Sequence, residues 1–187
     1  LYKNNLDNNY DFKNIFINTY KELLTQKELN NINKKLIVNG LKSAGNIFEN
    51  KNKNISKIKE IIIKEIDNYL LKYKNSDEGF IKNWKDDYKL NGWFVCMKSG
   101  GKINPHIHDY GLLSGSIYLN VPSEKINNSG DLVVSLTSQD SNYDNKDLSR
   151  IINIETGTIF LFPASLFHYT IPFSSKEDRI VLAFDVS

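Results

Sequence analysis

All three histidines of this chain are placed where one metal ion could bind them together. His106 and His108 are separated by a single residue, and His168 follows about sixty residues later. Alternate residues of a β-strand point to the same face, so His106 and His108 can present two imidazoles to one point. Neutral imidazole is a good ligand for iron, zinc, copper and nickel. The spacing therefore indicates a mononuclear metal site, with Arg179, eleven residues after His168, as a basic residue associated with it.

The three histidines do not by themselves fix the metal or its use. Zinc accepts the same ligands as iron, and three protein ligands leave coordination positions open, as a catalytic metal site requires. The ordinary alternative for His106 and His108 is a pair of surface residues at the rim of a sheet. Asp109 could also bind the metal in place of His108, although adjacent strand residues point to opposite faces.

The composition describes a folded protein with a mixed surface. Of 187 residues 40% are hydrophobic, and 24 basic residues stand against 22 acidic ones. This length and content predict one domain with a core, and the dispersed lysines argue against nucleic-acid binding. The single cysteine, Cys96, excludes an internal disulfide and favours a reducing compartment such as the cytoplasm. No apolar run reaches the roughly 20 residues of a membrane span. Because the first residue is Leu1 rather than Met, a targeting segment or further domain could precede it in a longer protein.

The first half of the chain is predicted to be a helical support region, residues 1–89. Apolar residues recur every three or four positions in residues 12–24 and again in residues 58–73. This period predicts two amphipathic helices, with Asp11 and Ser56 as their N-caps. The segment between them, rich in Asn and Lys, is predicted to be irregular. We expect the two helices to cover one face of a β-structure.

The second half, residues 90–187, is predicted to be the core of that single domain. Short apolar runs separated by Gly, Pro, Asn and Ser predict strands over residues 93–98, 114–121, 131–136, 151–155, 158–162, 167–171 and 179–186. Strands of this number and spacing indicate a sandwich or jelly roll, in which opposed strands can meet at an open mouth. Residues 99–102 are predicted to form a hairpin turn, and the acidic residues 139–147 a loop that borders the substrate entrance.

Five segments of this half, taken together, resemble a known enzyme family. Their order, spacing and flanking residues agree: 92–95 (GWFV), 104–108 (NPHIH), 113–122 (LSGSIYLNVP), 157–168 (GTIFLFPASLFH) and 179–185 (RIVLAFD). They are similar to the 2-oxoglutarate- and Fe(II)-dependent oxygenases, and most similar to the prolyl-hydroxylase-like bacterial and phage subset that carries an HxH motif. The resemblance covers residues 90–187 closely and extends more loosely to residues 45–48 and 58–73.

The resemblance implies a fold and a set of site residues. The fold is a double-stranded β-helix, or jelly roll, with N-terminal helices on one face. Fe(II) would be bound at its open end by His106, His108 and His168. The co-substrate 2-oxoglutarate would be held at its far carboxylate by Arg179, whose fork suits a carboxylate, and by the phenol of Tyr118.

Each co-substrate residue has an ordinary alternative. Arg179 could instead form an ion pair with Asp178 or Glu177, and Tyr118 could be a core aromatic residue. The wider superfamily has His-x-Asp followed by His, and here His108 stands at the carboxylate position. A neutral ligand would leave one more positive charge on the iron centre, a departure that the HxH subset shares.

The implied activity is that of a dioxygenase that uses O₂ and 2-oxoglutarate, hydroxylates a small molecule or peptide, and releases succinate and CO₂. Two alternatives remain open: a three-histidine jelly-roll metal enzyme that does not use 2-oxoglutarate, and a non-catalytic module that binds a ligand or partner chain. The sequence does not identify the substrate. Its specificity is expected to depend on residues 109–111, 123–129 and 137–149.

Overall fold

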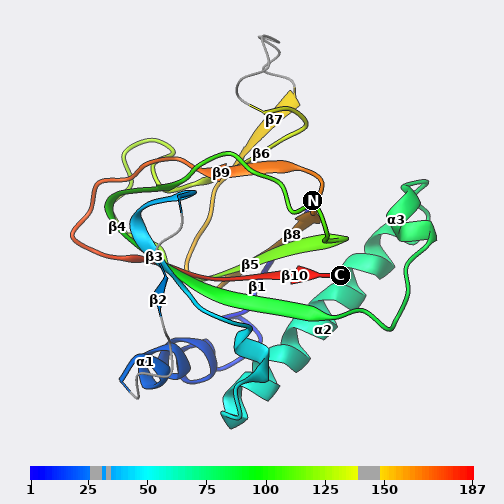
Figure 1. Cartoon of the computed structure of the whole chain (residues 1–187), viewed down its shortest axis with the longest axis horizontal. Coiled ribbons are helices and arrows are strands. Elements are labelled where there is room, and N and C mark those ends of the chain that lie inside the picture. Colours follow the sequence, from blue (N-terminus) through cyan, green and yellow to red (C-terminus); the bar gives the residue numbers. More distant parts are fainter. Residues whose placement is uncertain (26–30, 33–34, 139–147) are drawn as a thin grey trace.

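Two antiparallel sheets make up the β-structure of the parts of the chain that can be described. The computed structural model describes residues 1–25, 31–32, 35–138 and 148–187. Within these residues, the larger sheet has the strand order β1-β8-β5-β10-β4-β3-β2 and the smaller one the order β7-β6-β9 (Figure 1). His106 and His168 form an additional isolated bridge.

The strands and helices have the following bounds. The larger sheet contains β1 (Tyr2–Asn5), β2 (Asn31–Ile32), β3 (Ile37–Ser43), β4 (Leu90–Ile103), β5 (Leu113–Asn120), β8 (Thr158–Pro163) and β10 (Arg179–Val186). The smaller sheet contains β6 (Leu132–Ser135), β7 (Ser149–Ile152) and β9 (Phe167–Thr170). The helical segments are η1 (Lys13–Ile17), α1 (Asn18–Thr25), η2 (Ile47–Glu49), α2 (Lys53–Tyr73) and α3 (Gly79–Lys82).

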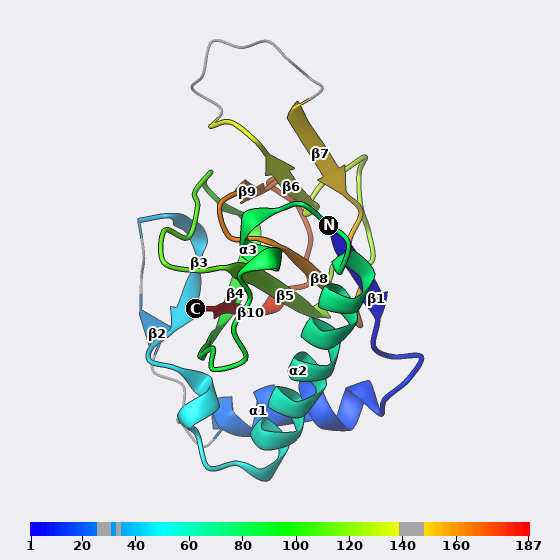
Figure 2. The same cartoon turned by 90° about the vertical axis from the view of Figure 1, so that its right-hand side faces the viewer.

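The helices α1 and α2 cover one face of the larger sheet (Figure 2). Helix α2 directs a stripe of buried side chains towards the sheet. These residues repeat with the helical period: Ile55, Ile58, Ile62, Ile66 and Tyr69. Alternate residues of β5 and β10, among them Ile117, Leu182 and Phe184, form the other side of this core. Buried Glu65 accepts hydrogen bonds from Tyr2 Oη (2.7 Å) and Asn4 Nδ2 (3.0 Å), which attaches β1 to the helix.

The opposite face of the larger sheet packs against the smaller sheet. Buried side chains of both sheets share this second core, including Tyr118, Phe160 and Val181 from the larger sheet and Leu132 and Val134 from the smaller one. Because side chains alternate along a strand, β5 and β10 each send one set of residues to the helices and the other set between the sheets. The fold is a double-stranded β-helix with helices packed on one face. The side chains that β5 and β10 direct between the two sheets contribute to the candidate site.

Most predicted elements are confirmed, with shifted ends. Each predicted strand has a counterpart, although the predicted strand 151–155 is found earlier, at β7. The first predicted helix begins with a π-helical turn, and Asp11 Oδ1 accepts a hydrogen bond from the backbone N of Asn14 (3.2 Å), as expected of an N-cap. The second helix begins at Lys53, and Asn52 accepts from Asn54 N (2.9 Å). The prediction of Ser56 as its cap was therefore wrong.

Two predictions about loops were also wrong. Residues 37–43, expected to be irregular, form β3, which pairs with β4. Residues 99–102, expected to form a hairpin turn, lie within β4, where Gly100 has a φ of 75° beside a register shift in β3. The glycine pair marks a bulge rather than the end of a strand, because glycine tolerates positive φ at low cost. The acidic residues 139–147 lie outside the described residues.

In the described parts of the chain, no helix has both the length and the apolar character needed to cross a bilayer.

Candidate metal centre

The imidazoles of His106, His108 and His168 lie together between the two sheets. One ligand atom from each lies within 4.8 Å of those of the other two. The ring centroids are 4.1 Å apart for His106 and His168, 4.9 Å for His108 and His168, and 5.1 Å for His106 and His108. Three nitrogen donors this close together can bind a single cation, and imidazole donors suit iron as well as zinc.

Backbone pairing brings the three histidines together. His106 N donates to His168 O (3.2 Å) and His168 N donates to His106 O (2.9 Å), which joins the HxH segment to the start of β9. His108 N donates to the carbonyl of Ala164, just after β8 (3.1 Å). Residues about sixty positions apart in the sequence are thus fixed beside each other by main-chain hydrogen bonds.

Burial keeps two of these rings neutral. Desolvation lowers the pKa of His106, and it lowers the pKa of His168 to about 3, with a smaller contribution from the neighbouring His106 and His108. Metal ligation requires neutral imidazole, so these rings are in the form that a cation needs at neutral pH. The donor set therefore fits a transition-metal ion.

Arg179 and Tyr118 lie in the same narrow cavity as the three imidazoles. Arg179 is only 2% exposed, and its guanidinium carbon is 5.2 Å from the centroid of the Tyr118 ring. Its Nε donates to Gly130 O (3.0 Å), and no described carboxylate forms an ion pair with it. Burial lowers its pKa and raises that of Tyr118. The carboxylate of Asp131 acts on the guanidinium only through space, without an ion pair. Burying the guanidinium without a direct partner is costly, so this cavity favours an anionic ligand.

The structure also places the alternatives that the sequence left open. Asp178 pairs with Lys98 (2.5 Å), and Glu177 accepts from Ser123 Oγ (2.6 Å), so neither is the partner of Arg179. Asp109 is exposed and lies outside the three-histidine cluster. Tyr118 is at once a core residue and a neighbour of Arg179, so its two interpretations do not exclude each other.

A partly buried ion pair holds the loop that contacts Arg179. Lys125 Nζ donates to Asp131 Oδ1 (2.6 Å) and to Ile154 O (2.6 Å), and the Asp131 side chain is 3% exposed. Asp131 follows Gly130, whose carbonyl accepts from Arg179. The ion pair therefore supports the position of the guanidinium.

Lys125→Met is expected to lower the free energy of unfolding by roughly 3–5 kcal/mol, because it leaves a buried carboxylate without its cation. Urea unfolding at neutral pH measures this. Lys98→Met is the matched control, since it removes the lysine of an exposed pair with Asp178 and should cost far less. If Lys125→Met lowers the free energy of unfolding no more than Lys98→Met does, the Lys125–Asp131 pair is not structurally important.

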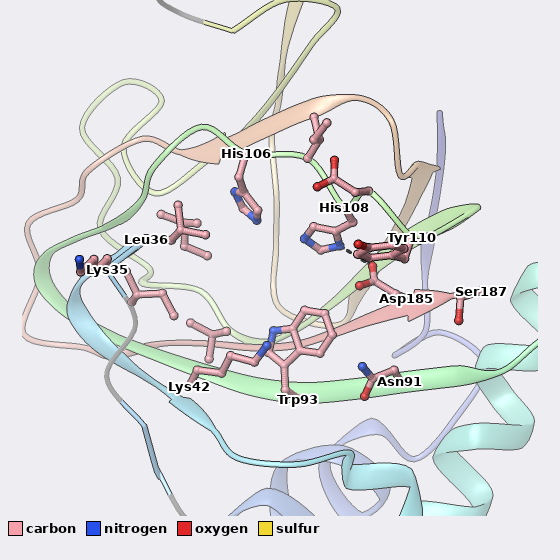
Figure 3. Close-up of a pocket in the computed structure, with 16 residues that line it drawn as sticks. Lys35, Leu36, Lys42, Asn91, Trp93, His106, His108, Tyr110, Asp185 and Ser187 are labelled. Carbon is pink, nitrogen blue, oxygen red and sulfur yellow. Dashed lines mark hydrogen bonds and ion pairs between the residues drawn. The ribbon is translucent and has the colours of Figure 1, made fainter.

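A wider cavity of about 690 Å³ opens next to His106 and His108. Figure 3 shows the two imidazoles pointing into it from the HxH segment, with Trp93 and Lys42 on the opposite wall. Lys42 Nζ lies 3.6 Å from the Trp93 ring centroid. Residues 109–111, predicted to affect specificity, line this cavity, whereas residues 123–129 line neither of the two cavities.

Sequence reasoning missed two polar residues at the centre. Asp185 Oδ1 is 2.5 Å from His108 Nδ1, and Ser114 Oγ donates to the same carboxylate oxygen (2.8 Å). Their periodicity could have shown which face of each strand they lie on, although not that they contact His108. Asp185 lies six residues after Arg179 on β10, and Ser114 lies four residues before Tyr118 on β5, so each faces the same side as a residue that was singled out.

The sequence matches the model of one protein family. Residues 91–185, just over half of the chain, match the family described as "Putative 2OG-Fe(II) oxygenase". The chain belongs to the 2OG-Fe(II) oxygenase family. It is therefore a 2-oxoglutarate- and Fe(II)-dependent dioxygenase, with Fe(II) as cofactor and 2-oxoglutarate as co-substrate. No curated protein matches this oxygenase.

Solved structures share the fold of the oxygenase at low sequence identity. A prolyl-4-hydroxylase from Pseudomonas putida has 13% identity and a TM-score of 0.63, over 99% of this chain and 90% of that chain. A Trichoplax adhaerens prolyl hydroxylase, solved with a hypoxia inducible factor peptide fragment, has 13% identity and a TM-score of 0.68, over 99% and 82%. HygX from Streptomyces hygroscopicus, with nickel and 2-oxoglutarate bound, has 10% identity and a TM-score of 0.56, over 95% and 79%. At these sequence identities the likeness shows a shared fold and nothing further.

Proposed function

We propose that this oxygenase hydroxylates an organic substrate while converting 2-oxoglutarate and O₂ to succinate and CO₂, with Fe(II) held by His106, His108 and His168. The observation that carries the proposal is the shared cavity, which is lined by three clustered imidazoles and by a buried arginine that forms no ion pair with any described carboxylate. A cation site and an anion site beside each other suit a metal-chelating dicarboxylate.

The histidines would hold the metal through Nε2. Their Nδ1 atoms contact oxygen acceptors, so the ring edge that faces the other two imidazoles is left for ligation. Bound Fe(II) would supply the redox chemistry with O₂ that neither imidazole nor guanidinium can perform. The protein contributes fixed ligands and a cavity shielded from water.

Arg179 and Tyr118 would orient the co-substrate. The guanidinium can donate two parallel hydrogen bonds to the far carboxylate of 2-oxoglutarate, and the phenol can donate a third. Because both groups are buried, these bonds form away from competing water and are stronger for it. The held carboxylate fixes the distance of the opposite, keto-acid end from the imidazoles.

The substrate would bind in the 690 Å³ cavity beside His106 and His108. Its walls combine aromatic rings, Trp93 and Tyr110, with basic side chains, Lys35 and Lys42 (Figure 3). A cavity of this size accepts a small molecule or the side chain of a peptide. We keep both as the proposed substrate classes.

We also propose that residues 1–187 act as one oxygenase domain. In support, helices α1 and α2 share a core with β5, β8 and β10, and β1 pairs with β8 along its whole length.

Succinate formation tests the proposed reaction. The protein with Fe(II), O₂ and 2-oxoglutarate is expected to release succinate and CO₂ in equal amounts, slowly without substrate and faster when a substrate is present. Adding candidate peptides and metabolites then becomes a screen for that acceleration. Substrate binding without any succinate would contradict the proposal and favour a non-catalytic binding module.

A further inference from the structure

The three imidazoles differ in the acceptor that their Nδ1 atom contacts. His106 Nδ1 lies 2.9 Å from Asn104 O, and His168 Nδ1 lies 3.1 Å from Leu166 O. Both acceptors are neutral backbone carbonyls. His108 Nδ1 instead lies 2.5 Å from Asp185 Oδ1, a carboxylate. An iron site with two histidines and one carboxylate has an anionic ligand. In the HxH motif of this chain, His108 takes the place of that carboxylate.

The structure holds Asp185 in place against this ring. Asp185 and Ser114 are directly opposite each other in the ladder between β10 and β5. Ser114 Oγ donates to Asp185 Oδ1 (2.8 Å) and also lies 3.1 Å from His108 Nδ1. The carboxylate is 19% exposed, and within the described residues it forms no ion pair with a lysine or arginine. Its charge is therefore directed to the imidazole of His108.

We propose that Asp185 is a positioning residue that restores, behind His108, the negative charge that the HxH motif removes from the metal's own ligands. This inference rests on the proposed Fe(II) site. A carboxylate that accepts from Nδ1–H fixes the tautomer, directs Nε2 to the metal and makes the imidazole a stronger donor. The centre then has three histidine ligands, and one of them, His108, is hydrogen-bonded to an anion.

The charge of Asp185 should affect two measurable properties of the metal centre, its Fe(II) affinity and its midpoint potential. Asp185→Asn keeps the shape and an oxygen acceptor but removes the charge, so Fe(II) affinity should fall by about 10- to 100-fold, measured anaerobically. The Fe(III)/Fe(II) midpoint potential should rise, since the lost charge stabilised Fe(III) more than Fe(II). A tenfold greater loss of affinity for Fe(III) than for Fe(II) corresponds to a rise of about 59 mV.

Asp109→Asn is the matched control for charge. Asp109 lines the same cavity but is exposed and lies outside the imidazole cluster, so its removal should leave both the affinity and the potential unchanged. If Asp185→Asn and Asp109→Asn shift the potential equally, the charge at Asp185 has no special role and the inference is wrong.

Ser114→Ala gives a second measurement that does not depend on the folding of Asp185→Asn. It removes a donor from the carboxylate, which should then accept more strongly from His108 and lower the potential, opposite to the effect of Asp185→Asn. A shift in the same direction, or none, would overturn the inference. His168→Ala separates the two proposals: undiminished Fe(II) binding in this variant would refute the metal site itself, and the role of Asp185 with it.

Discussion

His168→Ala is expected to weaken Fe(II) binding by more than about 100-fold, because it removes a ligand, and even the loss of a group behind a ligand costs roughly 10- to 100-fold. His168 is 8% exposed and bridges to His106 through its backbone, which the substitution leaves in place. The fold should therefore persist while the metal site is lost.

Thermal unfolding with and without metal measures this effect. A ligand at 100 times its Kd stabilises a protein by about 2.7 kcal/mol, so the original protein should melt at a higher temperature when Fe(II) is added without oxygen. His168→Ala should gain nothing under the same conditions. Asp109→Asn should gain as much as the original protein. The reverse order would make Asp109 the ligand in place of a histidine.

Arg179→Met is expected to weaken 2-oxoglutarate binding by about 2–5 kcal/mol, which is a factor of about 30 to several thousand. The buried guanidinium lines the same narrow cavity as the three imidazoles, and methionine fills similar space without charge. In the absence of ligand the variant should be as stable as the original protein or more so, since removing a buried charge without a counter-ion removes its desolvation cost.

Calorimetric titration of 2-oxoglutarate into the Ni(II)-loaded protein measures this affinity without turnover. Arg150→Met is the matched control, because Arg150 is the other arginine of the chain and lies exposed on β7. Tyr118→Phe should give a smaller loss, of about 1 kcal/mol, as expected for one hydrogen bond. Equal affinities in the Arg179 and Arg150 variants would favour a three-histidine enzyme that does not use 2-oxoglutarate.

The sequence predicted those parts of the site that depend on residue type and on spacing along one strand. The i, i+2 spacing of His106 and His108 drew attention to them, although both lie between β4 and β5, outside the named strands, and only His106 is in an isolated β-bridge. His168 and Arg179 were singled out because each lies at the start of a predicted strand. The strands themselves were predicted because each is a short apolar run bounded by Gly, Pro, Asn or Ser. The amphipathic helix α2 was predicted because its isoleucines repeat with the helical period.

The contacts that depend on the pairing of distant strands could not be predicted. Asp185 reaches His108 because β10 lies beside β5 in one particular register, which a single strand's pattern does not contain. Strand β3 was missed because Asn39 and Gly40 interrupt its apolar pattern, and β4 was cut short because Gly100 and Gly101 resemble a turn. In both strands the partner supplies hydrogen bonds that override the local signal.

The most direct test of the central claim is an anaerobic titration of the protein with Fe(II) and then with 2-oxoglutarate, followed by visible absorption. Chelation of iron by the keto-acid end should produce a metal-to-ligand charge-transfer band that saturates at one Fe(II) and one 2-oxoglutarate per chain. The band should be absent in His168→Ala and should require far more 2-oxoglutarate in Arg179→Met. Fe(II) binding by the intact protein with no band on addition of 2-oxoglutarate would contradict the account.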